Sequence, residues 1–256
     1  MSSAPAATEV VALLQLIGRH ASPQPAAALA RELGLPRSTT YRLLGVLRDA
    51  GLVTHAENDQ RWGLGPAAYE LGSAYSRQAP LQRISRPVLA RLIDATTHNA
   101  HLAVLHGRDV LYVIEERAPR RPSLVTDVGV RLPASLTASG LAMLAALPSQ
   151  QVRALFPSRD SFVQRQGRGP ASLTALQSEL AQVRRRGYAV ESDSVTAGFA
   201  SFAVAVLDHN ALPVAGVAVT YPHADTPETA PLAEAVVAAA AELSTRLGHR
   251  PTARAT

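Results

Sequence analysis

Residues 24–64 read QPAAALARELGLPRSTTYRLLGVLRDAGLVTHAENDQRWGL and decide the fold of the N-terminal part of the chain. Two amphipathic helical patterns, at 25–33 and 36–50, are separated by a Gly-Leu-Pro turn and followed by strand-like segments at 52–54 and 61–64. Gly34 follows the last periodic residue of the first helix, where a left-handed cap favours glycine. This order predicts a helix-turn-helix with a wing, an arrangement that places one helix in a DNA major groove.

The helix expected at 36–50 has two dissimilar sides. Its apolar side is expected to pack inward and consists of Thr40, Leu43, Val46, Leu47 and Ala50. Its other side is polar and flat, and consists of Ser38, Tyr41, Arg42, Gly45 and Asp49. No acidic residue lies three or four positions from Arg37 or Arg42, so local ion pairing does not explain these arginines.

A guanidinium group matches phosphate oxygens and guanine edges through its planar set of donors. The helix and the wing are therefore expected to contact DNA through Arg37, Ser38, Thr39, Tyr41, Arg42 and Arg61. The alternative for the helix alone is an ordinary solvated polar face. Trp62, the only tryptophan, is expected to anchor the wing to the helices rather than to stack on a base.

Composition narrows the chemistry that the chain can perform. All 25 Lys+Arg residues are arginine, which excludes a P-loop lysine or a lysine Schiff base, and the absence of cysteine excludes disulfides and thiolate zinc sites. The N-terminus lacks a basic signal-peptide region, and no apolar run approaches the ~18 residues of a membrane span. We therefore expect a cytoplasmic protein without membrane segments.

The remaining sequence alternates helical and strand patterns. Helices are expected at 9–20, with Thr8 as N-cap, and at 66–76, 81–97, 139–147, 149–156, 173–186 and 227–248. Strands are expected at 100–106, 109–116, 124–128, 188–191, 199–207 and 212–220. A break at 78–80 predicts a domain boundary near residue 78. An antiparallel sheet with helices beside it makes the C-terminal part an α+β domain.

Three ordered segments carry a family resemblance. They are LGLPRSTTYRLLGVLRDAGLV at 33–53, LPASLTASGLA at 132–142, and GYAVE at 187–191 followed by Gly198 and Val204. In this order they resemble the IclR (isocitrate lyase regulator) family of bacterial transcription factors. The chain departs from the family pattern where Ser135 and Leu141 replace a histidine and a lysine, where Ser201 replaces a cysteine, and where Val-Ala-Val at 204–206 replaces Ala-Pro-Val.

The resemblance implies a winged helix-turn-helix domain at 1–77, a linker helix region at 78–97 and a GAF-like effector-binding domain at 98–256. It further implies a homodimer or dimer of dimers on a near-palindromic operator in double-stranded DNA, with affinity modulated by a small-molecule effector. No cofactor or metal is expected. By motif, the effector-binding candidates are Leu124, Ala138, Ser139, Glu191, Ser201, Ala218 and Thr220.

Other interpretations compete with this one. The main rival is a small-molecule-processing enzyme with a vestigial head, although no GxSxG elbow surrounds any serine. A second rival is a head that binds protein. His98 and His101 could share a helical face and bind a metal, but without a third ligand they are expected to be surface histidines. Glu191 and Asp193, like the glutamates at 115–116, are expected to be solvated strand ends rather than a catalytic pair.

Overall fold

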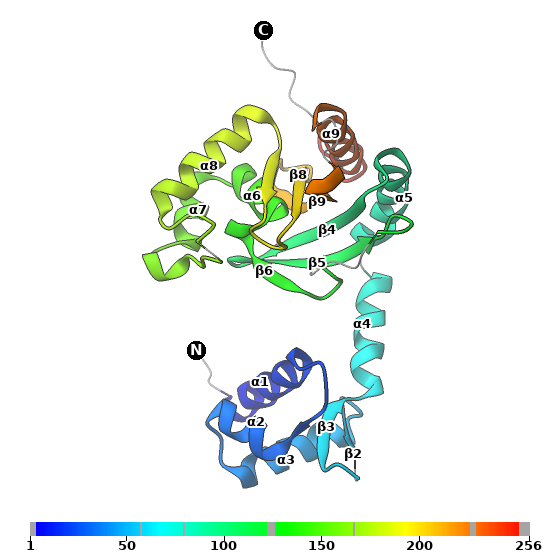
Figure 1. The fold of residues 1–256 in the computed structure, drawn as a ribbon. Coiled ribbons are helices and arrows are strands. Elements are labelled where there is room, and N and C mark those ends of the chain that lie inside the picture. The colour runs from blue at the N-terminus through cyan, green and yellow to red at the C-terminus, as the bar shows by residue number, and fades with distance from the viewer. Residues whose placement is uncertain are drawn as a thin grey trace. The chain divides into compact units, whose positions relative to one another are not determined.

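The computed structural model describes residues 4–56, 58–78, 80–121, 126–165, 167–225 and 229–250. The chain divides into two compact units, Met1–Ala79 and Pro80–Thr256 (Figure 1). In the described part of the chain, no helix has the length and apolarity needed to cross a membrane.

Unit 1 is a winged helix-turn-helix. Its elements are α1 (Pro5–Arg19), β1 (Gln24–Pro25), α2 (Ala26–Leu33), α3 (Arg37–Asp49), β2 (Val53–Ala56), β3 (Arg61–Leu64) and α4 (Pro66–Gln78). Strands β2 and β3 form the antiparallel wing, and the short β1, which the sequence did not predict, pairs with β3. Thr8 is not the N-cap of α1: it lies inside the helix, and its hydroxyl donates a hydrogen bond to the carbonyl of Ala4.

The turn between α2 and α3 is closed by backbone hydrogen bonds. Gly34 adopts φ 67°, which lets its N–H donate to the Arg31 carbonyl at 3.3 Å while the Leu35 N–H donates to the Ala30 carbonyl at 2.9 Å. These bonds satisfy carbonyls that the end of α2 would otherwise leave unpaired. The glycine predicted to end this helix therefore fixes the direction in which α3 leaves.

The buried side of α3 differs from the prediction. Thr40, Leu43, Leu44 and Leu47 are buried, whereas Val46 is 58% exposed and Ala50 is also exposed. Burial of Leu44 moves the centre of the apolar stripe, so Val46 lies roughly 110° away from it at ~100° per residue. The buried side of α3 thus includes fewer residues than its apolar residues suggested, and Val46 belongs to the exposed surface of the helix.

Unit 2 is built on a six-stranded antiparallel sheet, counted over the described residues, with the order β6-β5-β4-β9-β8-β7. Its strands are β4 (Asn99–His106), β5 (Asp109–Glu116), β6 (Arg131–Pro133), β7 (Ala189–Ser192), β8 (Phe199–Leu207) and β9 (Pro213–Pro222). Its α-helices are α5 (Pro80–Thr96), α6 (Ala138–Ala146), α7 (Ser149–Leu155), α8 (Leu173–Arg186) and α9 (Thr229–Arg246), with 3₁₀ turns η1 (Ala134–Leu136), η2 (Arg159–Ser161) and η3 (His223–Asp225).

Helices cover both faces of this sheet (Figure 1). Helices α5 and α9 pack on one face through an apolar cluster that includes Leu89, Leu102 and Val236. Helices α6, α7 and α8 contribute to a second cluster, which includes Met143, Phe156 and Leu180. The predicted α+β class is therefore confirmed.

The strand expected at 124–128 is not observed. Residues 124 and 125 lie outside the described residues, and 126–128 are not in a strand. The Val130 N–H donates to the Asp127 carbonyl at 3.1 Å, and Gly129 adopts φ 88°, so the chain turns here. Pairing with β5 becomes regular only after this turn, in β6.

Helix α6 lies close against its surroundings because two glycines leave room for it. Thr137 caps the helix by accepting a hydrogen bond from the Gly140 N–H at 3.0 Å. A Cβ on Gly140 would overlap the backbone of Ala134, and a Cβ on Gly216 in β9 would lie 2.9 Å from the Ser139 carbonyl oxygen. Both glycines therefore hold the first turn of α6 against η1 and the sheet.

Gly140→Ala is expected to destabilise unit 2 by about 2–3 kcal/mol, because the new methyl group has no room beside backbone atoms that cannot move independently. Gly72→Ala in α4 is the matched control, since nothing lies within 4 Å of its added Cβ, and it should stabilise unit 1 by about 0.5–1 kcal/mol. Urea unfolding checks both: Trp62, the only tryptophan, reports on unit 1, and circular dichroism follows both units. Wild-type stability of the Gly140 variant would contradict this packing.

Candidate functional site

The exposed side of α3 presents the residues predicted to contact DNA. Arg37, Ser38 and Arg42 are exposed, Tyr41 is 56% exposed, and Thr39 is half-buried. In the described part of the chain, no acidic side chain pairs with Arg37 or Arg42, whereas Arg48 on another side of the helix pairs with Asp49 at 3.1 Å. Two free guanidinium groups and several hydroxyl groups can bind phosphates and base edges.

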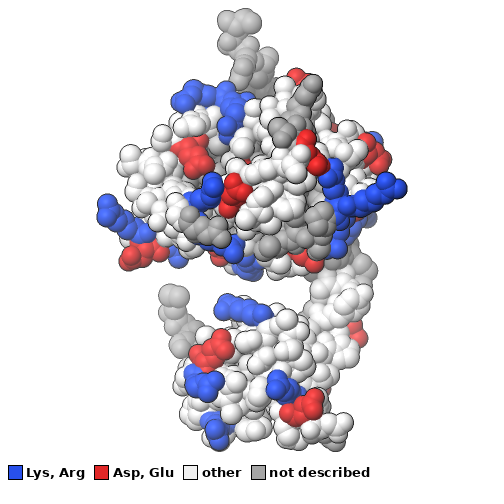
Figure 2. Space-filling view, in the orientation of Figure 1, with Lys and Arg blue, Asp and Glu red and all other residues white. Residues whose placement is uncertain are grey.

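The wing adds a further arginine beside its tip, where Arg61 pairs with Ala56. Arg61 is the exposed first residue of β3, and its Nη1 donates to the Pro23 carbonyl at 3.2 Å, which ties the wing to the segment before α2. Trp62 is 4% exposed within the helical core of unit 1, so its predicted anchoring role is confirmed. On the face that Figure 2 shows, the arginines of unit 1 lie singly rather than in one basic patch. DNA contact would therefore depend on local geometry.

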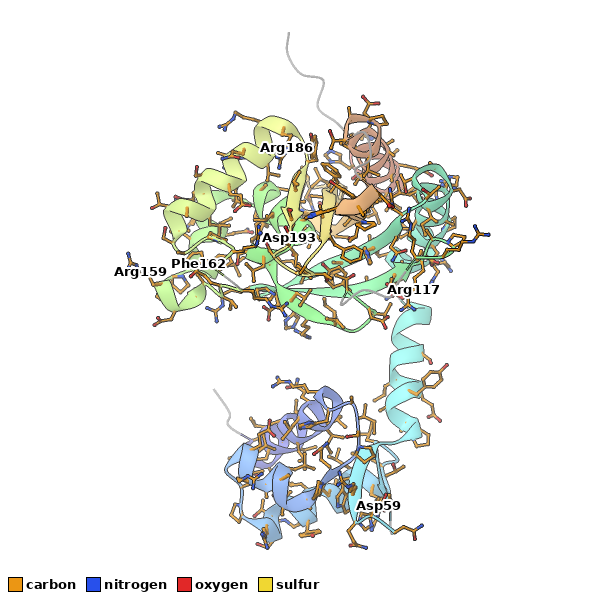
Figure 3. The ribbon with its side chains drawn as sticks, in the orientation of Figure 1. Asp59, Arg117, Arg159, Phe162, Arg186 and Asp193 are labelled. Atoms are coloured by element: carbon orange, nitrogen blue, oxygen red, sulfur yellow. The ribbon has the colours of Figure 1, made fainter. Side chains whose placement is uncertain are left out.

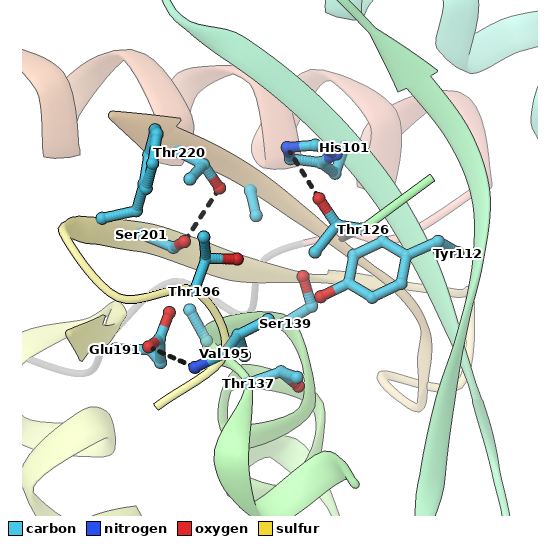
Figure 4. Close-up of a pocket in the computed structure, with 13 residues that line it drawn as sticks. His101, Tyr112, Thr126, Thr137, Ser139, Glu191, Val195, Thr196, Ser201 and Thr220 are labelled. Carbon is cyan, nitrogen blue, oxygen red and sulfur yellow. Dashed lines mark hydrogen bonds between the residues drawn. The ribbon is translucent and has the colours of Figure 1, made fainter. Parts of the chain in front are cut away.

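Unit 2 contains a pocket between the start of α6 and the sheet (Figure 4). Six of the seven predicted effector residues line it: Ala138, Ser139, Glu191, Ser201, Ala218 and Thr220. The seventh, Leu124, lies outside the described residues. The structure thus brings together residues from α6, β7, β8 and β9 that are up to 82 positions apart, the difference between 220 and 138.

Further lining residues were missed by sequence reasoning: His101, Tyr112, Thr126, Thr137, Val195, Thr196 and Phe199. Side chains alternate between the two faces of a sheet along β4 and β5, so His101 and Tyr112 can be assigned to a face only once the strand pairing is known. The sequence alone does not determine that pairing. The β-bulge at Leu102/Ala103 shifts the β4–β5 register between them.

The pocket is narrow. Its walls enclose about 370 Å³ of empty space including the mouth, of which only about 10 Å³ can hold the centre of a water molecule. In this form the pocket leaves little free space between its walls. Val195 and Thr196 in this wall belong to a loop between β7 and β8, and their side chains are half-buried.

Two carboxylates hold this loop. Glu191 accepts hydrogen bonds from the N–H groups of Ser194 at 2.6 Å and Val195 at 3.2 Å. Asp193, labelled in Figure 3, accepts one from the Gly198 N–H at 2.8 Å, and this bond, more than the nearby charges of His223 and Arg168, lowers the pKa of its carboxyl. The loop is therefore fixed mainly by side-chain acceptors on or beside β7.

Glu191 is not a solvated strand end, because it is 7% exposed. Burial raises the pKa of its carboxyl, while the hydrogen bonds from the loop and from Ser201 act in the opposite direction. The Glu115 side chain is also buried, at 3% exposure, and forms an ion pair with Arg117 at 2.8 Å, so the prediction for that strand end is wrong as well. The sequence did not predict the burial of Glu191 and Glu115, because it arises only from tertiary packing.

Hydroxyl groups dominate the rest of the pocket wall. Ser201 Oγ and Thr220 Oγ1, on paired positions of β8 and β9, lie 2.8 Å apart. Ser139 Oγ is buried and forms no well-aligned hydrogen bond among the described residues, although the Tyr112 hydroxyl points toward it and interacts with it (Figure 4). Burial, and then the charge of Glu191, raises the pKa of Tyr112. None of the described lining residues is a lysine or an arginine.

His101 closes one side of the pocket. It lies in β4 and is 1% exposed, so it is neither on a helix nor at the surface, and His98 is likewise buried outside any helix. Burial, assisted by the charge of Arg117, lowers the pKa of His101 to about 4. Its Nε2 lies 3.5 Å from Thr126 Oγ1. Among the described residues, no three histidine or acidic side chains are grouped so as to hold a metal ion.

The buried neutral imidazole gives stability a pH dependence. Because the pKa of His101 is about 4 when folded and 6.5 when exposed, its contribution is complete above pH 6.5 and decreases as the pH falls toward 4. Between pH 7.5 and 4.5, the unfolding free energy should decrease by about 2–3 kcal/mol through this group alone. The difference between wild type and His101→Gln, measured by urea unfolding at both pH values, isolates that contribution. Parallel pH profiles for the two proteins would rule it out.

Comparisons with known proteins identify the two units. The IclR helix-turn-helix domain matches residues 6–57, and the bacterial transcriptional regulator IclR C-terminal domain matches residues 73–245. The HTH-type transcriptional regulator BhcR of Paracoccus denitrificans is 31% identical over 88% of this chain and 81% of its own length. The transcriptional repressor IclR of Escherichia coli is 26% identical over 84% of this chain and 79% of its own length.

Solved structures agree with this assignment. An IclR transcriptional regulator from Silicibacter sp. TM1040 superposes with a TM-score of 0.82 at 25% identity, over 96% of this chain and 97% of its own. An IclR homologue from Microbacterium hydrocarbonoxydans, solved in complex with 4-hydroxybenzoate, shares the fold with a TM-score of 0.79 at 23% identity, over 94% of this chain and 98% of its own. The matched domains and relatives are regulators rather than enzymes. The chain belongs to the IclR family of bacterial transcriptional regulators.

Proposed function

We propose that this regulator binds a near-palindromic operator through the α3 face and the wing, and that a small molecule in the unit 2 pocket modulates that binding. Residues 1–77 would bind DNA, 78–97 would connect, and 98–256 would bind the effector, in a homodimer or dimer of dimers. The observation that carries the effector assignment is the convergence of six motif-derived residues on one buried pocket.

The DNA contacts divide by the position of each side chain. Ser38, Thr39, Tyr41 and Arg42 lie on or beside the exposed side of α3 and would read base edges or adjacent phosphates. Arg37 at the start of α3 and Arg61 at the wing would bind the phosphate backbone. Each bidentate arginine–guanine contact contributes about 1–3 kcal/mol of discrimination.

The effector would bind with an acceptor group, such as a carboxylate, at the start of α6. Ala138 and Ser139 are the first two residues of this helix, whose N–H groups have no partner within it. The buried Ser139 hydroxyl, which forms no well-aligned hydrogen bond among the described residues, lies at the same place. The related structure with 4-hydroxybenzoate supports a small organic acid as the class of ligand.

Effector binding would be coupled to DNA binding because the pocket is narrow. A ligand that displaces part of its wall would give the bound and free forms of unit 2 different shapes, and two heads would then be held at different spacings. A ligand that binds one arrangement ~100-fold more tightly shifts the equilibrium by ~2.7 kcal/mol. Such a shift is sufficient for a transcriptional switch.

Arg42→Ala is expected to weaken specific operator binding by about 10- to 100-fold without changing thermal stability, because the side chain is exposed and forms no ion pair among the described residues. Arg48→Ala is the matched control, since this arginine already pairs with Asp49. Fluorescence anisotropy with an operator selected from genomic fragments measures both. Normal site selection by the Arg42 variant would refute the assignment of α3.

Ser139→Trp and Thr220→Trp are each expected to abolish the effector response while operator binding is retained, because an indole would occupy the narrow pocket in place of the ligand. Ser178→Trp on the exposed side of α8 is the control and should respond normally. Operator release is followed while small organic acids are titrated. An unchanged response in both pocket variants would remove the pocket from the mechanism.

A further inference from the structure

His101 is a polar side chain in the pocket wall whose hydrogen bonding is incomplete. It is 1% exposed, its Nδ1 has no hydrogen-bond partner among the described residues, and its Nε2 has only the 3.5 Å contact with Thr126. Buried polar atoms are nearly always paired, and leaving one unpaired costs about 1–3 kcal/mol. An unpaired imidazole in a pocket wall is therefore a position where a ligand can contribute the missing bond.

This imidazole comes from β4, a different element from α6, whose start carries the acceptor site. Figure 4 shows His101 and Thr126 together on one side of the pocket, away from Glu191 and the Val195 backbone. Tyr112 packs edge-on against His101, with ring centroids 5.9 Å apart, and this contact fixes the orientation of the imidazole. The pocket therefore offers polar positions from different elements, with apolar surface from Ala138, Ala218 and Phe199 in its walls.

The groups at this second position are uncharged. Thr126 and Tyr112 contribute hydroxyl groups, and the depressed pKa of His101 keeps its ring neutral at physiological pH. The cation near His101, Arg117, is not a lining residue, and it is engaged by Glu115 at 2.8 Å and Asp127 at 3.4 Å. A neutral imidazole beside a hydroxyl can both donate and accept a hydrogen bond, which matches a hydroxyl or carbonyl group better than a second carboxylate.

We propose that His101 and Thr126 form a second polar subsite of the effector pocket, which binds an uncharged hydroxyl or carbonyl group of the ligand. This proposal rests on the effector pocket proposed above and specifies its ligand: an organic acid that carries a hydroxyl or carbonyl group, rather than a plain aliphatic or aromatic acid. A site built to hydrogen-bond such a group rejects analogues that lack it, because the analogue leaves the buried partners unpaired.

Isothermal titration of the full-length protein with two matched pairs of probes tests the proposal. The pairs are 4-hydroxybenzoate with benzoate and lactate with propionate, which differ only in the hydroxyl group. The wild type should bind the hydroxylated member of at least one pair about tenfold more tightly or better. His101→Leu should reduce this ratio to near one, Thr126→Val should reduce it partly, and His101→Gln, which keeps a donor and an acceptor, should retain part of it.

His98→Leu is the matched control. His98 is also a buried histidine of unit 2 with an unpartnered Nδ1 among the described residues, but it does not line the pocket, so the ratio should stay at the wild-type value. A merely structural role of His101 would weaken both members of a pair equally. Thermal melting identifies variants that fail to fold. If His101→Leu does not fold, the affinity ratios of Thr126→Val and His101→Gln test the proposal instead.

The outcomes separate the two proposals. A wild-type ratio near one in both pairs, or a ratio that survives His101→Leu, would overturn the second subsite while leaving the pocket in place. If no probe binds, or if binding persists in Ser139→Trp, the effector pocket itself is refuted and the subsite with it.

Discussion

The close contact between the first turn of α6 and the backbone around it is the constraint on which the unit 2 pocket depends. Gly140 lies against the backbone of Ala134, and Gly216 of β9 lies against Ser139, so neither position has room for a side chain. The contact brings the unpaired N–H groups of a helix start to the sheet surface, opposite strands that contribute hydroxyl groups. A helix held by backbone contacts rather than by long side chains is a rigid base for recognition, because few rotamers can relax.

Both candidate sites rely on a few polar groups that are left without partners rather than on a large accumulation of charge. On α3, two arginines lack acidic neighbours while the unit as a whole has little excess charge. In the pocket, Ser139 Oγ and His101 Nδ1 are buried and form no well-aligned hydrogen bond among the described residues. Unpaired groups of this kind reduce stability and are retained where a ligand completes them. The loop at 193–198, fastened by Glu191 and Asp193, is the part of the wall whose bonds a ligand could exchange.

Sequence reasoning succeeded where the determinants are local and failed where they are not. Gly34 predicted the helix-turn-helix because its left-handed cap depends on adjacent residues only. The pocket residues Ser201 and Thr220 were found through family motifs, not through their pattern. His101 and Tyr112 were missed because the sheet face to which they point depends on strand pairing across a bulge. Val46 was wrongly predicted to be buried because Leu44 occupies the core instead. The burial of Glu191 likewise arises from segments far away in the chain.

The account holds that one molecule links two sites in different units, and this linkage is thermodynamically reciprocal. The most direct test is to measure the affinity of a pocket ligand, beginning with 4-hydroxybenzoate, by calorimetry with and without a saturating operator duplex. The account predicts that operator DNA changes this affinity by about tenfold or more, by the same factor with which the ligand changes operator affinity. Equal ligand affinities for the free and the DNA-bound protein would contradict it.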